Sequence, residues 1–301
     1  MAATMDVTVF LQNLINGLTV GCLYALISIG YTMVYGILRL INFAHGDLFM
    51  MAMYFAFFGI TVFFIPWWAA MILVIIATGL LGITIERTAY RPLREAPRIS
   101  LLISSIGVSY LLENLATVIF TGVPRSFPSV NYFQQIVLLG KLRIQMLAFW
   151  VPGIVAALVF LLLYIVKRTK TGMAMRAVSK DMETARLMGV HINKTIATTF
   201  GIGSTLAAAG AMLWGMKYPM INPYVGLMPG LKCFIAAVIG GIGNITGAII
   251  GGILLGVIEI MIVAFFPGIS GYKDAFAFVA LILILLFKPT GLMGEAVTDK
   301  V

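Results

Sequence analysis

Apolar stretches recur along this chain almost from end to end, and they constrain its fold more than any other feature. An α-helix needs about 20 mainly apolar residues to cross the hydrocarbon core of a bilayer. The stretches lie near residues 10–37, 48–65, 67–85, 99–120, 147–166, 195–216, 231–244, 246–266 and 273–288. They predict an all-α polytopic membrane protein with about eight or nine transmembrane helices. The seventh stretch is too short to cross, so we expect a broken or re-entrant helix there.

Charge is scarce, and most of it lies in short loops. Charged residues make up 10% of the chain and hydrophobic residues 61%, whereas an average soluble domain is about 25% charged. The net charge of +9 lies in loops between apolar stretches, so we expect membrane lipid around the chain and no nucleic acid. No loop is long enough for a soluble domain, and we predict one transmembrane domain spanning residues 1–301.

Two basic loops predict the orientation of the chain in the membrane. Residues 86–98 carry four arginines, and residues 167–194 carry seven lysines and arginines. Two apolar stretches separate these loops, so both lie on one side, which the positive-inside rule makes cytoplasmic. We therefore expect a periplasmic N-terminus and, with nine crossings, a cytoplasmic C-terminus. We expect this membrane to be a bacterial inner membrane.

The chain contains a weak internal repeat. An offset of 180 residues aligns identical residues in two segments without a gap. These are Thr19, Gly21, Leu26, Gly30, Ile41, Asn42 and Gly46 in the first and Thr199, Gly201, Leu206, Gly210, Ile221, Asn222 and Gly226 in the second. An odd number of crossings separates the segments, so the second copy runs in the opposite direction. Inverted repeats of this kind are typical of transporters; the alternative is coincidence in a chain rich in Gly and Ile.

Polar residues interrupt the apolar pattern at the end of each repeated segment. Asn42, His45 and Gly46 follow the first long stretch, and Asn222, Pro223 and Tyr224 occupy the matching place in the second copy. In transporters, such helix breaks expose backbone and side-chain polar groups to the substrate pathway. We interpret these six residues as pathway residues. The alternative is that they cap and terminate helices.

The second basic loop has an amphipathic pattern. In residues 172–194, apolar side chains recur at steps of three and four residues, and charged side chains occupy much of the remaining surface. This pattern predicts a helix that lies outside the membrane core and ends at Gly189. It either rests on anionic lipid or docks into a groove of a partner protein.

Two further patterns concern the interior of the helix bundle. Gly243, Gly247 and Gly251 are spaced four apart, as are Gly252 and Gly256. This spacing permits close helix packing; the alternative is that these glycines form one wall of a subunit contact. Glu113, Lys232 and Glu259 lie within apolar stretches, where isolated charges are costly. We expect them to form a structural charge pair, with a role in the pathway as the alternative.

The sequence offers no site for chemistry. It lacks the G-x-x-x-x-G-K-[ST] phosphate-binding loop and a recognisable pair of nucleophile and base. His45 and His191 are far apart and have no metal-ligand spacing, and Cys22 and Cys233 lie in apolar stretches. We therefore predict that the chain is not an enzyme and holds neither a metal ion nor another cofactor.

Several motifs together resemble the permease family of branched-chain amino-acid ABC importers, specifically its LivH-like subunits. The resemblance runs from about residue 10 to 295. The motifs are 30–37 (GYTMVYGI), 41–46 (INFAHG), Glu86-Arg87 with 89–92 (AYRP), 221–224 (INPY), 236–243 (AAVIGGIG) and 288–291 (KPTG).

The resemblance implies import of leucine, isoleucine, valine or related neutral amino acids into the cytoplasm. It also implies three kinds of partner: a related second permease in a heterodimer, two cytoplasmic ABC ATPases, and a periplasmic amino-acid-binding protein. Such permeases contact their ATPases through a cytoplasmic helix that often carries E-A-A-x-x-x-G. Residues 183–189 resemble this motif, with Thr184 in place of the first Ala. We accordingly expect coupling residues at Arg176, Glu183, Ala185, Arg186 and Gly189.

Three other functions compete with this interpretation. A permease of the same family that transports urea or short amides has similar motifs, because the binding protein usually selects the substrate. An ion-coupled secondary transporter would use Asp47, Glu113 and Glu259 as ion sites. A purely structural membrane protein is disfavoured by the inverted repeat.

Overall fold

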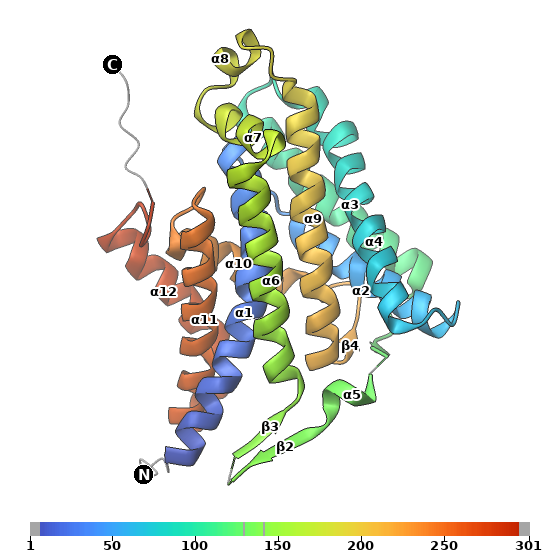
Figure 1. Ribbon diagram of the computed structural model, residues 1–301, viewed down its shortest axis with the longest axis vertical. Coiled ribbons are helices and arrows are strands. Elements are labelled where there is room, and N and C mark those ends of the chain that lie inside the picture. Colours follow the sequence, from blue (N-terminus) through green and yellow to red (C-terminus); the bar gives the residue numbers. More distant parts are fainter. Residues whose placement is uncertain (1–6, 129, 141, 295–301) are drawn as a thin grey trace.

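The computed structural model describes residues 7–128, 130–140 and 142–294, and the described part is a bundle of membrane-length helices (Figure 1). Seven helical segments are long and apolar enough to cross a bilayer. They contain α1 (Val7–Leu38), α3 (Trp67–Ile85), α4 (Arg98–Phe120), α6 (Leu147–Arg168), α9 (Ile192–Lys217), α11 (Ile245–Phe265) and α12 (Lys273–Phe287). The expected all-α polytopic fold is confirmed.

Two shorter apolar helices complete the bundle. α2 (His45–Thr61) has 17 residues, and α10 (Leu227–Gly240) has 14. Each follows a non-helical segment that leads back from the end of a long helix, α1 or α9. The short seventh helix expected from the sequence is therefore α10, whereas the shortness of its counterpart α2 was not expected.

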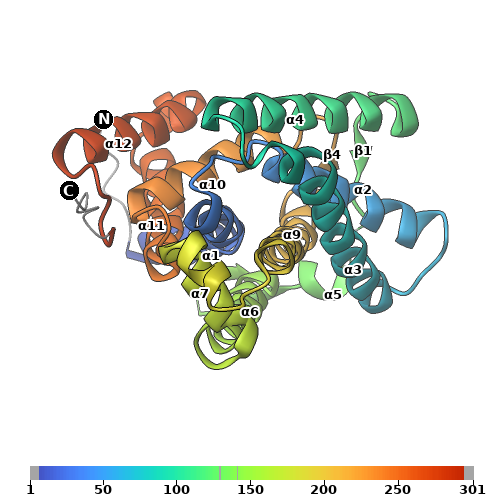
Figure 2. The same cartoon turned by 90° about the horizontal axis from the view of Figure 1, so that it is seen from above.

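The inverted repeat is visible in the packing. The segment from α1 to α4 contains its helices in the same order as the segment from α9 to α12. The first helices of the two segments, α1 and α9, run in opposite directions (Figure 1). Contacts come in matching pairs: α1 packs on α11 as α9 packs on α3, and α1 packs on α10 as α9 packs on α2. In the view of Figure 2, α3 and α11 flank the central α1–α9 pair on opposite sides. The internal repeat is therefore a feature of the structure and no coincidence of composition.

The two helix breaks meet in the middle of this arrangement. A Cβ atom on Gly46 would lie 2.6 Å from the carbonyl oxygen of Gly226, its counterpart in the second copy. Gly46 would also meet the Cα of Gly230 on α10. Since equivalent residues of the two repeats touch here, the pseudo-two-fold axis passes close to this contact, and only glycine fits on either side.

The closely spaced glycines of α11, here called the glycine ladder, are buried within the helix bundle; they are Gly247, Gly251, Gly252 and Gly256. Gly252 and Gly256 face Ala25 and Gly21 on α1, and Gly251 faces the carbonyl of Ala236 on α10. Helices α1 and α10 thus already cover the ladder on both sides. Close packing within the subunit is confirmed, and the alternative of a contact between subunits is wrong. Gly243 lies outside the ladder, in the loop before α11, with a φ of +94°.

The basic loop forms two helices, so the prediction of a single helix from residue 172 to Gly189 is wrong. α7 (Lys170–Lys180) ends where Asp181 adopts extended backbone angles, and α8 (Met182–Leu187) begins there. The Asp181 carboxylate accepts hydrogen bonds from the backbone amides of Glu183 and Thr184, which caps α8. The predicted end at Gly189 is confirmed: its φ is +83°, and the amide of Val190 donates to the carbonyl of Ala185 in a Schellman motif.

Short elements close the two ends of the bundle. After α3 come a π-helix, η1 (Glu86–Tyr90), and a 3-10 turn, η2 (Arg91–Leu93); η3 (Pro267–Tyr272) precedes α12. At the end opposite α7 and α8 lie α5 (Asn131–Gln134) and a hairpin of β2 (Ile136–Leu139) and β3 (Leu142–Gln145) (Figure 1). There β1 (Arg125–Ser126) also pairs with β4 (Met220–Ile221), joining the loop after α4 to the second helix break.

Candidate functional site

The first helix break packs His45 against α1. Arg39, with a φ of +51°, reverses the chain after α1. The His45 ring then lies over Gly30, where a Cβ atom would approach it to 2.6 Å. Its Nε2 is 3.2 Å from the carbonyl oxygen of Ile27, and its ring meets the Tyr31 ring edge to face. His45 is therefore buried in the contact between α1 and the start of α2.

Asn42 anchors the break to the first repeat. Its Oδ1 accepts a 2.7 Å hydrogen bond from the Tyr90 hydroxyl on η1, and the Ser105 hydroxyl on α4 reaches the carbonyl of Ile41. The Asn42 side chain is almost fully buried, and its Nδ2 has no hydrogen-bond partner among the described residues. The bond from Tyr90 to the buried Asn42 amide therefore links the position of the first break to that of η1.

Replacing Tyr90 with phenylalanine is expected to destabilise the protein by about 1–3 kcal/mol, because the Asn42 amide then loses its partner while it remains buried. Thermal unfolding of the purified chain measures the effect. Tyr164→Phe removes a hydroxyl from an exposed position on α6 and should change stability by less than about 0.5 kcal/mol. Equal effects of the two substitutions would show that the bond to Asn42 does not hold the break.

The second helix break is built from local turns. The Asn222 Oδ1 accepts from the backbone amide of Tyr224 at 2.9 Å, and the amide of Val225 donates to the Asn222 carbonyl. Pro223 is buried, whereas Tyr224 is exposed. Asn222 thus serves the turn itself, as the capping alternative expects, and Tyr224 is left facing outward.

The six predicted pathway residues do not converge on one cavity in this conformation. The structure brings the two breaks together at Gly46 and Gly226, but Asn42 and His45 point into separate packed environments. Two pockets are described, and none of the six lines either. The closeness of the breaks agrees with a pathway between the repeats, and the role of each side chain stays a prediction.

A buried carboxylate lies next to the first break. Asp47, in the first turn of α2, accepts a 2.5 Å hydrogen bond from the Ser109 hydroxyl on α4. Glu113 follows one turn later on α4 and is also buried. The pairing of Asp47 with Ser109 on α4 depends on packing that the sequence does not show.

Lys232 and Glu259 lie together in a buried ion network. The Lys232 Nζ is 2.8 Å from Glu259 Oε1 and 2.6 Å from Asp274 Oδ1. The Tyr24 hydroxyl donates to Glu259 Oε2 at 2.8 Å, and Lys273 approaches Glu259 to 3.8 Å. Helices α1, α10, α11 and α12 are thereby linked. Glu113 lies elsewhere, on α4, and Asp274, Lys273 and Tyr24 are members that sequence reasoning missed.

The predicted coupling residues separate into exposed and buried positions. Arg176 on α7 is exposed, as are Glu183 and Arg186 on α8. Ala185 is only 4% exposed and packs inward, so it supports α8 rather than offering a contact. Gly189 shapes the end of α8.

The most exposed apolar side chains of this region were missed. Leu187 and Met188 are 87% and 80% exposed, at the tip of the bundle that carries α7 and α8 (Figure 1). The sequence does carry a signal, two large apolar residues directly before the glycine that ends a polar helix. Exposed apolar side chains at a capped helix end are typical of a protein contact.

No group of three or more His, Cys, Asp or Glu residues within the described ranges is arranged to hold a metal ion. Cys22 and Cys233 are both free thiols. Among the described residues, the buried polar groups therefore form hydrogen-bond and ion networks, and the most exposed apolar side chains near α7 and α8 lie at the end of α8.

Comparison with known proteins gives a consistent assignment. The family model described as "Branched-chain amino acid transport system / permease component" matches residues 13–285. The chain is 44% identical to the high-affinity branched-chain amino acid transport system permease protein BraD of Pseudomonas aeruginosa, covering 97% of this chain and 98% of the relative. It is 39% identical to the corresponding permease protein LivH of Escherichia coli K12, with the same coverage.

More distant proteins share the fold. The probable permease LivH of Methanocaldococcus jannaschii is 27% identical over 90% of this chain and 89% of its own. Among solved structures, PsaBC from Streptococcus pneumoniae in complex with Fab aligns with a TM-score of 0.50 and 16% identity, covering 93% of this chain and 92% of that one. At this identity the structural match shows the fold alone.

Proposed function

Because this chain belongs to the permease family of branched-chain amino acid transport systems, we propose that it is the permease subunit of an ATP-driven importer of leucine, isoleucine, valine or related neutral amino acids. The observation that carries this proposal is the identity of 44% to a branched-chain amino acid permease across almost the full length of both proteins. The inverted repeat, whose two helix breaks touch at Gly46 and Gly226, supports a transport role.

The proposed orientation follows from the basic residues. The end of the bundle with α7 and α8 also carries the arginines of residues 87–98, so it faces the cytoplasm of a bacterial inner membrane. α1 begins at the opposite, periplasmic end (Figure 1). Leu292 and Met293 would lie on the cytoplasmic side as well, because their amides donate to the carbonyls of Ile239 and Gly240 at the end of α10. A periplasmic amino-acid-binding protein would dock on the hairpin end.

Energy would come from two separate ABC ATPases that dock on α7 and α8. The sequence has no phosphate-binding loop of the G-x-x-x-x-G-K-[ST] type. The tip formed by Leu187 and Met188 offers an apolar anchor, and exposed Glu183 and Arg186 supply charges beside it. Interfaces depend on a few such anchors surrounded by polar contacts.

A movement of this tip would reach both repeats. α7 packs against α1 and α9, the central helices of the two repeats, and α8 packs against α9. Closure of the ATPases would therefore shift α9 relative to α1 and open the contact between the breaks. Broken helix ends can bind the charged termini of an amino acid, while apolar side chains accept its aliphatic part. A related second permease would form the other wall of the pathway.

Leu187→Asp is expected to reduce ATP-driven leucine uptake by the reconstituted complex at least tenfold. Loss of a central apolar anchor typically weakens an interface by about 2 kcal/mol or more, and an aspartate adds an unpaired charge. Uptake into proteoliposomes measures the effect. Leu187→Met keeps the apolar surface and should retain most of the uptake.

The charges of α8 provide a second check. If exchange of both charges by Glu183→Lys with Arg186→Glu, or Leu187→Asp itself, left uptake unchanged, the ATPases would not dock at this tip. Reduced uptake with undiminished folded protein on gel filtration is the result that supports docking.

Copurification from native membranes tests the proposed assembly. We expect a second, related permease and two ATPase copies to accompany the tagged chain. Recovery of the chain alone, with transport activity, would refute the assignment. The substrate is tested separately by competition: leucine, isoleucine and valine should block uptake by the complex, whereas transport of urea or short amides in their place would move the protein to another branch of the family.

A further inference from the structure

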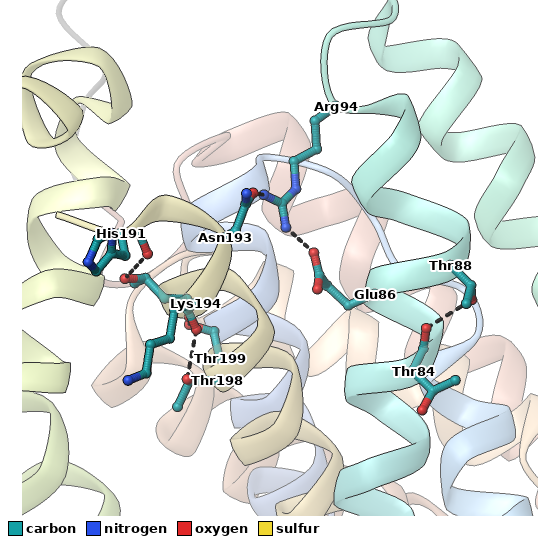
Figure 3. A network of polar contacts seen from close by, with 10 residues as sticks. Thr84, Glu86, Thr88, Arg94, His191, Asn193, Lys194, Thr198 and Thr199 are labelled. Carbon is teal, nitrogen blue, oxygen red and sulfur yellow. Dashed lines mark hydrogen bonds and ion pairs between the residues drawn. The ribbon is translucent and has the colours of Figure 1, made fainter.

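A pocket opens at the proposed cytoplasmic ends of two helices that belong to different repeats. It lies between the end of α3 with η1 and η2 and the beginning of α9, and its volume is about 380 Å³. Its lining includes Arg87, Arg91, Lys194 and Thr198, together with apolar Ile83 and Ala197. Figure 3 shows the α9 and α3 sides of this region facing each other.

The one acidic residue of the pocket lining is already neutralised. Glu86 is only 1% exposed and forms an ion pair with Arg94, and the Arg94 Nη1 donates to Asn193 Oδ1 at 2.6 Å (Figure 3). Burial lowers the pKa of the Arg94 guanidinium and the Glu86 carboxylate opposes that shift, so the arginine keeps its charge. The network both holds α9 to the end of α3 and removes the repulsion that Glu86 would exert on an anion.

Three cations of the pocket are left without an acidic partner. Arg87, Arg91 and Lys194 are exposed, and none of them forms an ion pair with another described residue. The Thr198 hydroxyl donates to the carbonyl of Lys194, which leaves its oxygen only as an acceptor. The pocket therefore presents several positive charges that no acidic side chain among the described residues pairs with, and it lies where the apolar helix α3 ends.

An apolar track on the lipid-facing side of α3 leads to the same place. Ile72, Ile76 and Leu80 are each more than half exposed and lie one turn apart. The track continues through Ile83 to Arg87. A ligand that filled both features would have an anionic head and a long hydrocarbon chain parallel to α3.

We propose that this pocket binds the headgroup of an anionic phospholipid of the cytoplasmic leaflet, with an acyl chain along the exposed face of α3. Basic pockets at the cytoplasmic ends of transmembrane helices suit such headgroups. Free phosphate would use the cations but not the apolar track. Because the pocket joins α3 of one repeat to α9 of the other, beside the end of α8, the lipid would hold the repeats together where the coupling movement enters.

Lipid binding to the purified full chain in neutral detergent tests the proposal without any transport assay. Phosphatidylglycerol should bind saturably, and phosphatidylcholine of the same chain length should bind far more weakly. Arg87→Gln with Arg91→Gln should weaken phosphatidylglycerol binding about twenty-fivefold, because each basic side chain beside the anionic headgroup contributes about fivefold. Arg87→Lys with Arg91→Lys keeps the charges and should retain most of the affinity, which separates loss of charge from misfolding.

A matched control removes two cations outside the pocket. Arg98→Gln with Lys170→Gln changes two exposed side chains that do not line the pocket, and screening by salt should keep the change in affinity within about twofold. Four outcomes would overturn the proposal. The first is that phosphatidylcholine binds as tightly as phosphatidylglycerol, and the second is that the control variant loses as much affinity as Arg87→Gln with Arg91→Gln. The third is that inorganic phosphate competes as strongly as the lipid. The fourth is that Arg87→Gln with Arg91→Gln abolishes ATPase copurification but leaves lipid binding intact. The last would make the pocket a protein contact.

Discussion

Gly256→Leu is expected to abolish recovery of folded permease. Gly256 on α11 lies directly against the backbone of Gly21 on α1, and even a Cβ atom would overlap the Gly21 amide and Cα. A leucine there must push apart the two helices that share the most extensive contact in the bundle. Overpacking of ordinary side chains costs about 1–3 kcal/mol, and here the neighbour is backbone that cannot rotate away. Since native stability is only about 5–15 kcal/mol, the yield of monodisperse protein on gel filtration should fall at least tenfold.

Gly153→Leu is the matched control. Gly153 lies on α6, is exposed, and has open space where a side chain would project. The same substitution should therefore leave the yield nearly unchanged. A normal yield of Gly256→Leu, or an equal loss in Gly153→Leu, would contradict the packing of α1 on α11.

Lys232→Met is expected to lower the free energy of unfolding by about 3–5 kcal/mol, the range seen when one partner of a buried ion pair is removed. The substitution leaves Glu259, only 6% exposed, without its 2.8 Å partner. Asp274 contributes less, because it is 37% exposed and water can solvate it. Thermal unfolding should show a decrease in the midpoint on the order of 10 °C.

Two further variants show whether charge is the cause. Glu259→Gln combined with Lys232→Met removes the unpaired charge and should restore much of the lost stability. Lys273→Met removes a 47% exposed cation that is 3.8 Å from Glu259, so its effect should stay below about 1 kcal/mol. A small effect of Lys232→Met, or no recovery in the double variant, would show that Lys232 does not stabilise Glu259.

The membrane-spanning architecture could be predicted because it follows from local composition. The length of an apolar stretch fixes whether a helix crosses the bilayer, and identities such as Asn42 with Asn222 preserve the repeat. The division of the basic loop at Asp181 was missed although its cause is local. An aspartate can cap a helix from within an amphipathic pattern, and the apolar periodicity continued across it.

The roles of individual polar residues were harder to predict, because they depend on the packing of distant segments. Gly30 is 15 positions before His45, yet the space left by its missing side chain is what admits the His45 ring into the bundle. Tyr90 is the partner of Asn42 only because the π-helix η1 returns to the first break. Lys232 and Glu259 could be predicted to form a charge pair because charge is rare in apolar stretches. Asp274 was overlooked because it begins a helix, where acids are ordinary.

Exposure, too, was not readable from the sequence. Ala185 fits the coupling motif but packs inward, whereas Leu187 projects from the tip. The apolar pattern of α8 correctly indicates a buried face, which includes Ala185. At the capped end of the helix, however, Leu187 and Met188 point outward. The motif positions alone therefore do not show which of the predicted coupling residues are exposed.

We expect this chain to transport only when separate ATPases drive it. Radiolabelled leucine uptake into proteoliposomes tests this most directly, comparing the complete complex with its binding protein against the purified chain alone. The proposed function predicts uptake by the complete complex that requires ATP, and none by the chain alone under a proton or sodium gradient. Gradient-driven uptake by the chain alone would contradict it, and would make Asp47, Glu113 and Glu259 sites of ion coupling instead.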